Sequence, residues 1–166
     1  REHCAAHPDE PFPVAVVLGA DPATILAAVT PVPDTLSEYQ FAGLLRGAKT
    51  ELVKCIGSDL QVPASAEIVL EGVIHPGETA AEGPFGDHYG HYSEASPFPV
   101  FHVKTVTRRR DAIYPGAVVG KPPQEDKWIG LAAGEMIGPL IRVVNPNIVD
   151  LFASDDAVFH NLLTVS

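Results

Sequence analysis

The sequence predicts a mixed α+β domain that is mainly antiparallel β, a sheet or a barrel with helical insertions. Its 166 residues suit one domain of ordinary size, and 46% of them are hydrophobic, which excludes a disordered chain. Proline occurs 16 times and glycine 14 times, and prolines at this density interrupt long helices, so a helical bundle is excluded. The candidate strands are irregular in length and do not alternate regularly with helices, which favours antiparallel pairing.

The first predicted strand covers residues 13–19, a β-branched run that begins at a proline and ends at a glycine. A short apolar run bounded by turn residues is typical of a buried strand rather than of a helix. Asp21 and Pro22 follow and offer an N-cap and a proline at the first helical position. We therefore expect a helix that begins after Asp21 and runs to about Val29.

A second helix start lies at Ser37. Ser37 and Gln40 have the spacing of a capping box, the apolar residues that follow fall on one face, and Gly47 supplies a C-terminal stop. Glu38 occupies the first turn, where the helix dipole favours a carboxylate. Simple electrostatics is therefore a sufficient explanation for Glu38 when its residue type is considered alone.

The remainder of the chain is predicted to be mostly strands and loops. We expect strands at residues 51–56, 66–74, 98–107 and 112–119, and a third helix from about residue 127 to residue 137. Glu67 and Glu71 share one of these strands at a spacing of four, so their side chains lie on the same face. That face is predicted to be solvated.

Charge and cysteine content restrict the function. The formal net charge of −10 argues against nucleic acid as a partner, because phosphate binding needs clustered Lys and Arg. The one basic run, residues 108–110, is predicted to be a solvated strand end. Cys4 and Cys55 are too few for a disulfide framework and lack metal-site spacing, which fits a reducing, cytoplasmic setting. No apolar run approaches the roughly 18 residues of a membrane-spanning helix.

The loop of residues 78–92 carries the most informative chemistry. Glu82 and Asp87 lie in it around two glycines and a proline, residue types that fix backbone shape. Two carboxylates in a shaped pocket can divide roles, one ionised beside a cation and one protonated as a proton donor. A glycine-rich turn with exposed acids explains the same residues. His88 and His91 are metal-ligand types, but their spacing in a loop fixes no geometry, so we expect no zinc site there.

Six segments, taken in order, carry a resemblance to a known family. They are residues 13–24 (PVAVVLGADPAT), 37–39 (SEY), 41–47 (FAGLLRG), 62–72 (VPASAEIVLEG), 82–87 (EGPFGD) and 120–126 (GKPPQED). Together they resemble the UbiD family of decarboxylases over almost the whole chain. The sequence is most similar to the bacterial members that decarboxylate 4-hydroxy-3-polyprenylbenzoate in ubiquinone biosynthesis.

The resemblance implies a fold, cofactors and residue roles. Family members use prenylated FMN, a divalent metal that is Mn²⁺ or Mg²⁺, and a monovalent cation such as K⁺, and their central domain is a split β-barrel of the flavin reductase type. Glu38 matches the metal-binding glutamate, Glu82 the glutamate that pairs with a catalytic arginine, and Asp87 the acidic proton donor. Pro31 matches a position near the flavin ring, and Val119 a position near the substrate.

The resemblance also bears on the extent of the chain. Family enzymes are much longer, and the partner arginine of Glu82 and two further metal ligands precede the matched segment. We therefore expect residues 1–166 to be the central prenylated-FMN-binding domain of a longer, hexameric enzyme and not to decarboxylate alone. The expected substrate is a polyprenylated aromatic acid, reached by peripheral contact at the inner face of the cell membrane. The alternatives are another aromatic or α,β-unsaturated acid, and a non-catalytic flavin-binding split barrel.

Overall fold

The computed structural model describes residues 2–30, 32–33, 35–158 and 161–166, and it confirms a mixed α+β fold with antiparallel sheets. The chain divides into two compact units, which we describe one at a time. The first unit comprises residues 1–82 and 95–115, and the second comprises residues 83–94 and 116–166. Within the described ranges every sheet is open, and none closes into a barrel.

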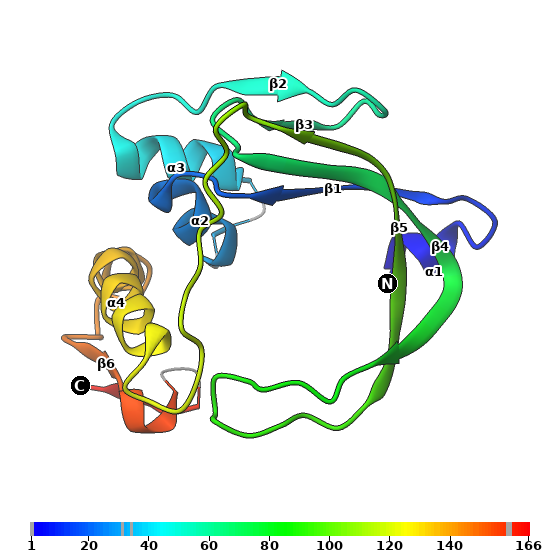
Figure 1. Cartoon of the computed structure of the whole chain (residues 1–166). Helices are drawn as coiled ribbons and strands as arrows, with labels where there is room; N and C mark the ends of the chain where they lie inside the picture. The colour runs from blue at the N-terminus through cyan, green and yellow to red at the C-terminus, as the bar shows by residue number, and fades with distance from the viewer. Residues whose placement is uncertain (1, 31, 34, 159–160) are drawn as a thin grey trace. The chain divides into compact units, whose positions relative to one another are not determined.

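A three-stranded antiparallel sheet forms the centre of the first unit. Its strands, in spatial order, are β1 (Phe12–Leu18), β4 (Ile68–Glu82) and β5 (Ser96–Arg108). Figure 1 shows β4 and β5 as a long and strongly bent pair. A second sheet pairs β2 (Leu52–Lys54) with β3 (Gln61–Pro63), and β3 is not among the predicted strands.

Both predicted helix starts are confirmed. The helices of the first unit are α1 (Glu2–Ala6), α2 (Pro22–Val29) and α3 (Glu38–Arg46). Asp21 caps α2 by accepting a hydrogen bond from the backbone N–H of Thr24, and Ser37 forms the capping box of α3 with Gln40. Gly47 ends α3 with a φ of 70°, a left-handed conformation that glycine adopts without strain.

Two small apolar clusters hold the first unit together. Ala27, Phe41 and Ala42 join α2 to α3, and all three are almost completely buried. Cys55, Val62 and Val69 join the β2–β3 hairpin to the central sheet. Burial of apolar surface stabilises such contacts by roughly 25 cal/mol per Å². The first cluster therefore packs the two helices against each other, and the second fixes the hairpin to the sheet from which β4 continues to Glu82.

The prediction of a solvated face for Glu67 and Glu71 is wrong. Glu71 is only 3% exposed, and its carboxylate accepts hydrogen bonds from the backbone N–H groups of Ile56 at 3.0 Å and Gly57 at 2.7 Å. Glu67 accepts hydrogen bonds from Arg109 at 2.9 Å and from the backbone N–H of Ile113 at 3.0 Å. The turn after β2 covers Glu71, and the segment after β5 contacts Glu67, which precedes the first residue of β4.

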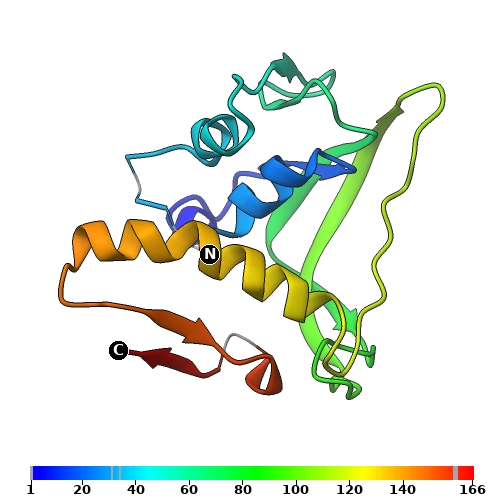
Figure 2. The ribbon, with the colours of Figure 1, turned by 90° about the vertical axis from the view of Figure 1, so that its left-hand side faces the viewer.

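The second unit contains a long helix and a short hairpin. The helix α4 (Glu125–Val144) contacts the strand β6 (Leu151–Ala153), which pairs with β7 (Leu163–Val165) and is followed by a 3₁₀ turn, η1 (Asp155–Ala157). In Figure 2 the yellow-to-orange α4 runs alongside the red hairpin. The loop of residues 83–94 belongs to the same unit.

One prediction for the chain after β5 is confirmed in part and one is wrong. The expected helix of residues 127–137 forms, but it begins at Glu125 and ends at Val144, with Pro139 inside it although an interior proline is unfavourable in a helix. The expected strand of residues 112–119 does not form. β-Propensity alone does not make a strand, and this segment pairs with no other described strand. None of the described helices combines the length and hydropathy that a membrane crossing requires.

Candidate active site

The start of α3 presents the carboxylate of Glu38. Ser37 Oγ accepts a hydrogen bond from the backbone N–H of Tyr39 at 3.2 Å, and Gln40 Oε1 accepts one from the backbone N–H of Ser37 at 3.2 Å. These bonds fix the first turn and satisfy two of its unpaired donors. Glu38 is exposed, and its carboxylate makes no hydrogen bond or ion pair within the described residues. It is therefore free to bind a cation.

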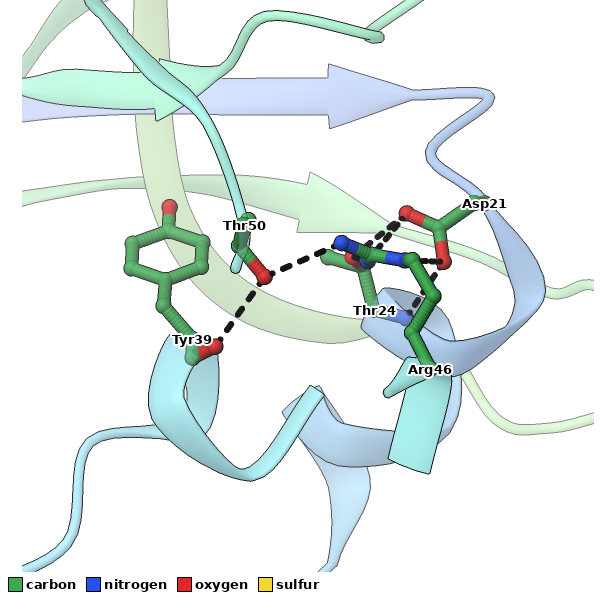
Figure 3. A network of polar contacts seen from close by, with 5 residues as sticks. All are labelled: Asp21, Thr24, Tyr39, Arg46 and Thr50. Carbon is green, nitrogen blue, oxygen red and sulfur yellow. Dashed lines mark hydrogen bonds and ion pairs between the residues drawn. The ribbon is translucent and has the colours of Figure 1, made fainter. Parts of the chain in front are cut away.

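A network of polar contacts fixes the helix that carries Glu38 (Figure 3). Arg46 donates to Asp21 through Nε at 3.2 Å and through Nη2 at 2.7 Å, and to the Thr24 hydroxyl at 2.9 Å. Its Nη1 also donates to the Thr50 hydroxyl at 3.3 Å, which in turn donates to the carbonyl of Tyr39 at 3.0 Å. The network thus links the first turn of α2 to both ends of α3.

The sequence indicates only one part of this network, the N-cap provided by Asp21. Burial acts to raise the pKa of Asp21, but the hydrogen bonds from Thr24 and Arg46, together with the Arg46 charge, lower it below its usual value. Arg46 was part of a resemblance motif, yet no pattern in the sequence pairs it with Asp21. A basic residue in the last turn of a helix is already explained by the helix dipole.

Tyr39, beside Glu38, points its hydroxyl toward the carbonyl of Gln61 at the start of β3, to which it donates at 3.4 Å. Burial raises the pKa of Tyr39, and the nearby Cys55 and Glu38 act in the same direction. The tyrosine is therefore a neutral hydrogen-bond donor at ordinary pH. It ties the beginning of α3 to the β2–β3 hairpin.

The two acids of the glycine-rich loop occupy different surroundings. Glu82 is the last residue of β4, where it pairs with Ser96 of β5, and it is exposed. It belongs to the first unit, whereas Asp87 belongs to the second. Glu38 lies in the same unit as Glu82, but on a different element, and within the described residues no hydrogen bond or ion pair joins the two.

The loop around Asp87 is tightly hydrogen-bonded. Asp87 Oδ1 accepts from the backbone N–H groups of Tyr89 at 2.9 Å and His91 at 3.3 Å, and the backbone N–H of Asp87 donates to the His91 carbonyl at 3.0 Å. Phe85 and Ser93 close the same loop through two further hydrogen bonds. One carboxylate oxygen of Asp87 thus fixes the turn, while Oδ2 accepts no hydrogen bond from the described residues and remains available.

The remaining predicted positions are less constrained. Val119 is 56% exposed and lies in the irregular segment that was expected to be a strand. Pro31 lies outside the described residues. His88 approaches Asp126 at 3.9 Å, and among the described residues neither His88 nor His91 belongs to a group of three potential metal ligands.

Comparison with known proteins places these residues in a family. The family model described as the UbiD 3-octaprenyl-4-hydroxybenzoate carboxy-lyase Rift-related domain matches residues 1–122. An evolved dimeric form of the UbiD-class enzyme HmfF from Pelotomaculum thermopropionicum, solved with prFMN, is 30% identical with a TM-score of 0.81, over 98% of this chain and 38% of that one.

Two aromatic acid decarboxylases are similar as well. Vanillic acid decarboxylase of Sedimentibacter hydroxybenzoicus in its closed form is 30% identical with a TM-score of 0.85, over 99% of this chain and 34% of that one. The 3,4-dihydroxybenzoic acid decarboxylase AroY of Klebsiella pneumoniae is 28% identical with a TM-score of 0.80, over 99% and 36%. The chain spans little more than a third of the length of these enzymes. On the family model and these structural matches together, the chain belongs to the UbiD family.

Proposed function

We propose that this chain forms the central part of a decarboxylase that uses prenylated FMN and acts on an aromatic or α,β-unsaturated acid. The observation that carries the proposal is the structural similarity, over 99% of the chain, to decarboxylases of vanillic acid and of 3,4-dihydroxybenzoic acid. A more specific substrate, 4-hydroxy-3-polyprenylbenzoate, is supported by the description of the matching family model.

The proposal extends to the fold, the oligomeric state and the location of the whole enzyme. The bent β4–β5 pair is consistent with a domain that is a split β-barrel of the flavin reductase type in the whole protein. The active enzyme is a homo-oligomer, expected to be a hexamer, and one of the similar enzymes was solved as a dimer. A polyprenyl substrate is strongly apolar, which favours a cytoplasmic enzyme that contacts the membrane surface peripherally.

Glu38 fits a divalent cation. Mn²⁺ and Mg²⁺ prefer hard oxygen ligands, and the exposed Glu38 carboxylate is such a ligand, held on a capped helix that the Asp21–Arg46 network fixes. Glu38 would therefore be one ligand of the Mn²⁺ or Mg²⁺ that, together with K⁺, accompanies the cofactor. Ligands outside this chain would complete the site.

Asp87 would donate the proton, and Glu82 would pair with an arginine. When bound, prenylated FMN supplies an electron sink for the pair of electrons that carbon dioxide leaves behind. Asp87, held in place through Oδ1, would deliver a proton to the reacting carbon from Oδ2. Glu82 would stay ionised opposite an arginine, and Pro31 and Val119 would lie near the flavin ring and the substrate.

The test replaces Asp87 in the holoenzyme that contains this chain. Asp87→Asn should retain the visible absorbance of the bound flavin and lower carbon dioxide release by at least about 100-fold, because general acid catalysis contributes about 10² to 10⁴. Asp111→Asn, the same substitution at an exposed aspartate outside the loop, is the control and should leave turnover unchanged. Carbon dioxide release at the unaltered rate by Asp87→Asn would remove Asp87 from its role.

A substrate panel separates the finer alternatives. Vanillate, 3,4-dihydroxybenzoate and 4-hydroxy-3-polyprenylbenzoate are offered to the same holoenzyme, and the acid with the highest kcat/KM identifies the substrate class. A full-length preparation that is colourless, and stays colourless after reconstitution with prenylated FMN, would instead favour a non-catalytic, purely structural split barrel.

A further inference from the structure

Two histidines and a glutamate meet on the β4–β5 pair, in the first unit. His75 and Glu78 belong to β4, and His102 belongs to β5. His102 Nε2 lies 2.7 Å from Glu78 Oε2, and the rings of His75 and His102 meet edge to face with centroids 5.2 Å apart. One potential ligand atom of each residue lies within 4.8 Å of the other two.

An irregularity in β4 brings these residues together. Between the pairs Ile74–Phe101 and Thr79–Pro99, residues 75–78 of β4 stand opposite Val100 alone. In a regular strand, residues at an odd spacing such as 75 and 78 project from opposite faces. The extra residues cancel this alternation, and Gly77 makes the turn with a φ of 79°, which glycine tolerates best.

His102 reaches the same place through the register of the sheet. It stands opposite Val73, so His75 is its diagonal neighbour on the same face. Diagonal neighbours across an antiparallel pair are within reach of long and aromatic side chains. The bulge and the register together form a three-residue cluster that no spacing in the sequence indicates.

The donor set selects a class of ion. Two imidazoles and one carboxylate suit Zn²⁺ and its borderline neighbours Co²⁺, Ni²⁺ and Cu²⁺, whereas Mg²⁺ and Ca²⁺ prefer oxygen ligands alone. Zinc bonds of about 2.0–2.2 Å place tetrahedral ligand atoms about 3.3–3.6 Å apart. The present separations therefore need only side-chain rotation, and the exposure of His75 and Glu78 permits it.

We propose that His75, Glu78 and His102 form a binding site for a zinc-class divalent ion, with a fourth position open to solvent. The ion replaces the Glu78–His102 contact with bonds from both residues and adds a bond from His75. Because the ligands come from two strands, the bound ion fastens the bulge of β4 to β5. None of the three residues has a role in the proposed decarboxylation.

The test is a calorimetric titration of the full-length protein that contains this chain, stripped of metal, with Zn²⁺ in excess Mg²⁺, which occupies oxygen sites. We expect one Zn²⁺ per chain. His75→Gln, Glu78→Gln and His102→Gln should each weaken this binding by more than about 10-fold, the effect reached even by partners of metal ligands. Circular dichroism of each variant checks that the fold is intact, and all three residues are at least partly exposed.

A second close pair of histidines provides a control for non-specific binding of Zn²⁺ to imidazole. His3 and His7 stack with ring centroids 4.6 Å apart near the N-terminus. The double variant His3→Gln/His7→Gln should bind Zn²⁺ as the unaltered chain does, and Co²⁺ should give the visible absorption of a tetrahedral site in both. The proposal is overturned if no Zn²⁺ binds, if binding is unaltered by any one of the three substitutions, or if it is lost in the control.

Discussion

Glu71 illustrates how one side chain can hold a hairpin to a sheet. Its carboxylate is buried beneath the turn that follows β2 and accepts both the Ile56 and the Gly57 backbone N–H groups. Hydrogen bonds to a charged acceptor contribute about 1.5–3 kcal/mol, and a buried donor without a partner costs a similar amount. Glu71 is therefore a structural residue, although its residue type and position in a strand would equally suit the surface.

Glu71→Gln is expected to lower the free energy of unfolding by about 1–3 kcal/mol, because the amide nitrogen would face a backbone N–H that needs an acceptor. Urea unfolding measures the loss, and hydrogen exchange of the Ile56 and Gly57 amides should accelerate. Glu51→Gln, an exposed glutamate of the same unit, should change stability by less than about 0.5 kcal/mol. Equal effects of both substitutions would show that the two hydrogen bonds contribute nothing.

The Asp21–Arg46 pair makes stability depend on pH. The pKa of Asp21 is lowered in the folded state, so its contribution is fully present above the unfolded value of about 3.9 and is lost as the pH falls through the folded value. Urea unfolding between pH 6 and pH 2.5 should show this loss. Asp21→Asn keeps a capping oxygen but carries no charge, and its stability should approach that of the unaltered chain at the acid end. A constant difference across this range would contradict the assignment.

At the scale of elements, β4 shows how glycine decides strand pairing. The register shifts between Glu71 and Gly72, where β5 comes very close. A Cβ on Gly72 would clash with the carbonyl oxygen of His102 and lie 2.9 Å from the Phe101 ring. The first neighbour is backbone of the paired strand, which cannot move without breaking the ladder.

Gly72→Ala should therefore lower the free energy of unfolding by about 3 kcal/mol, the upper part of the range for overpacked sites. The matched control is Gly134→Ala in α4, where a Cβ meets nothing within 4 Å and the helix gains about 0.5–1 kcal/mol. Thermal unfolding of both variants gives the comparison. A tolerated Gly72→Ala would mean that β5 can separate from β4 at this point.

Whether a helix or strand could be predicted depends on how far apart in the sequence its interacting residues lie. The starts of α2 and α3 were predicted correctly because capping bonds join residues only a few positions apart. The strand expected at residues 112–119 did not form because a strand needs a partner, which no local run of residues specifies. The extension of β4 to Glu82 was missed for the same reason, since β5 supplies its pairing partners.

At the scale of the whole molecule, the chain consists of two compact units, and each unit is built from two separate segments of the sequence. The segment of residues 110–124 joins β5 to α4 and contains neither helix nor strand. Proteases cleave where the backbone can be drawn into their active site without breaking secondary structure.

Limited trypsin digestion should therefore cut first at Arg110, before Lys104 in β5 or Arg142 in α4. Lys121 precedes Pro122, and trypsin does not cleave a Lys–Pro bond. Mass spectrometry of early time points identifies the cut. A first cut inside β5 or α4 would show that these elements open more readily than the connecting segment.

The sequence by itself determined the family, the helix starts and the residues proposed for metal, charge and proton roles, namely Glu38, Glu82 and Asp87. Motifs and caps are local, so they can be read along the chain. Only the tertiary structure decided that Glu71 is buried, that Arg46 bonds Asp21, and that two histidines meet Glu78 on a bulge. Each of these features depends on contacts between residues far apart in the sequence. Strand register and packing create such contacts, and no periodicity in the sequence encodes them.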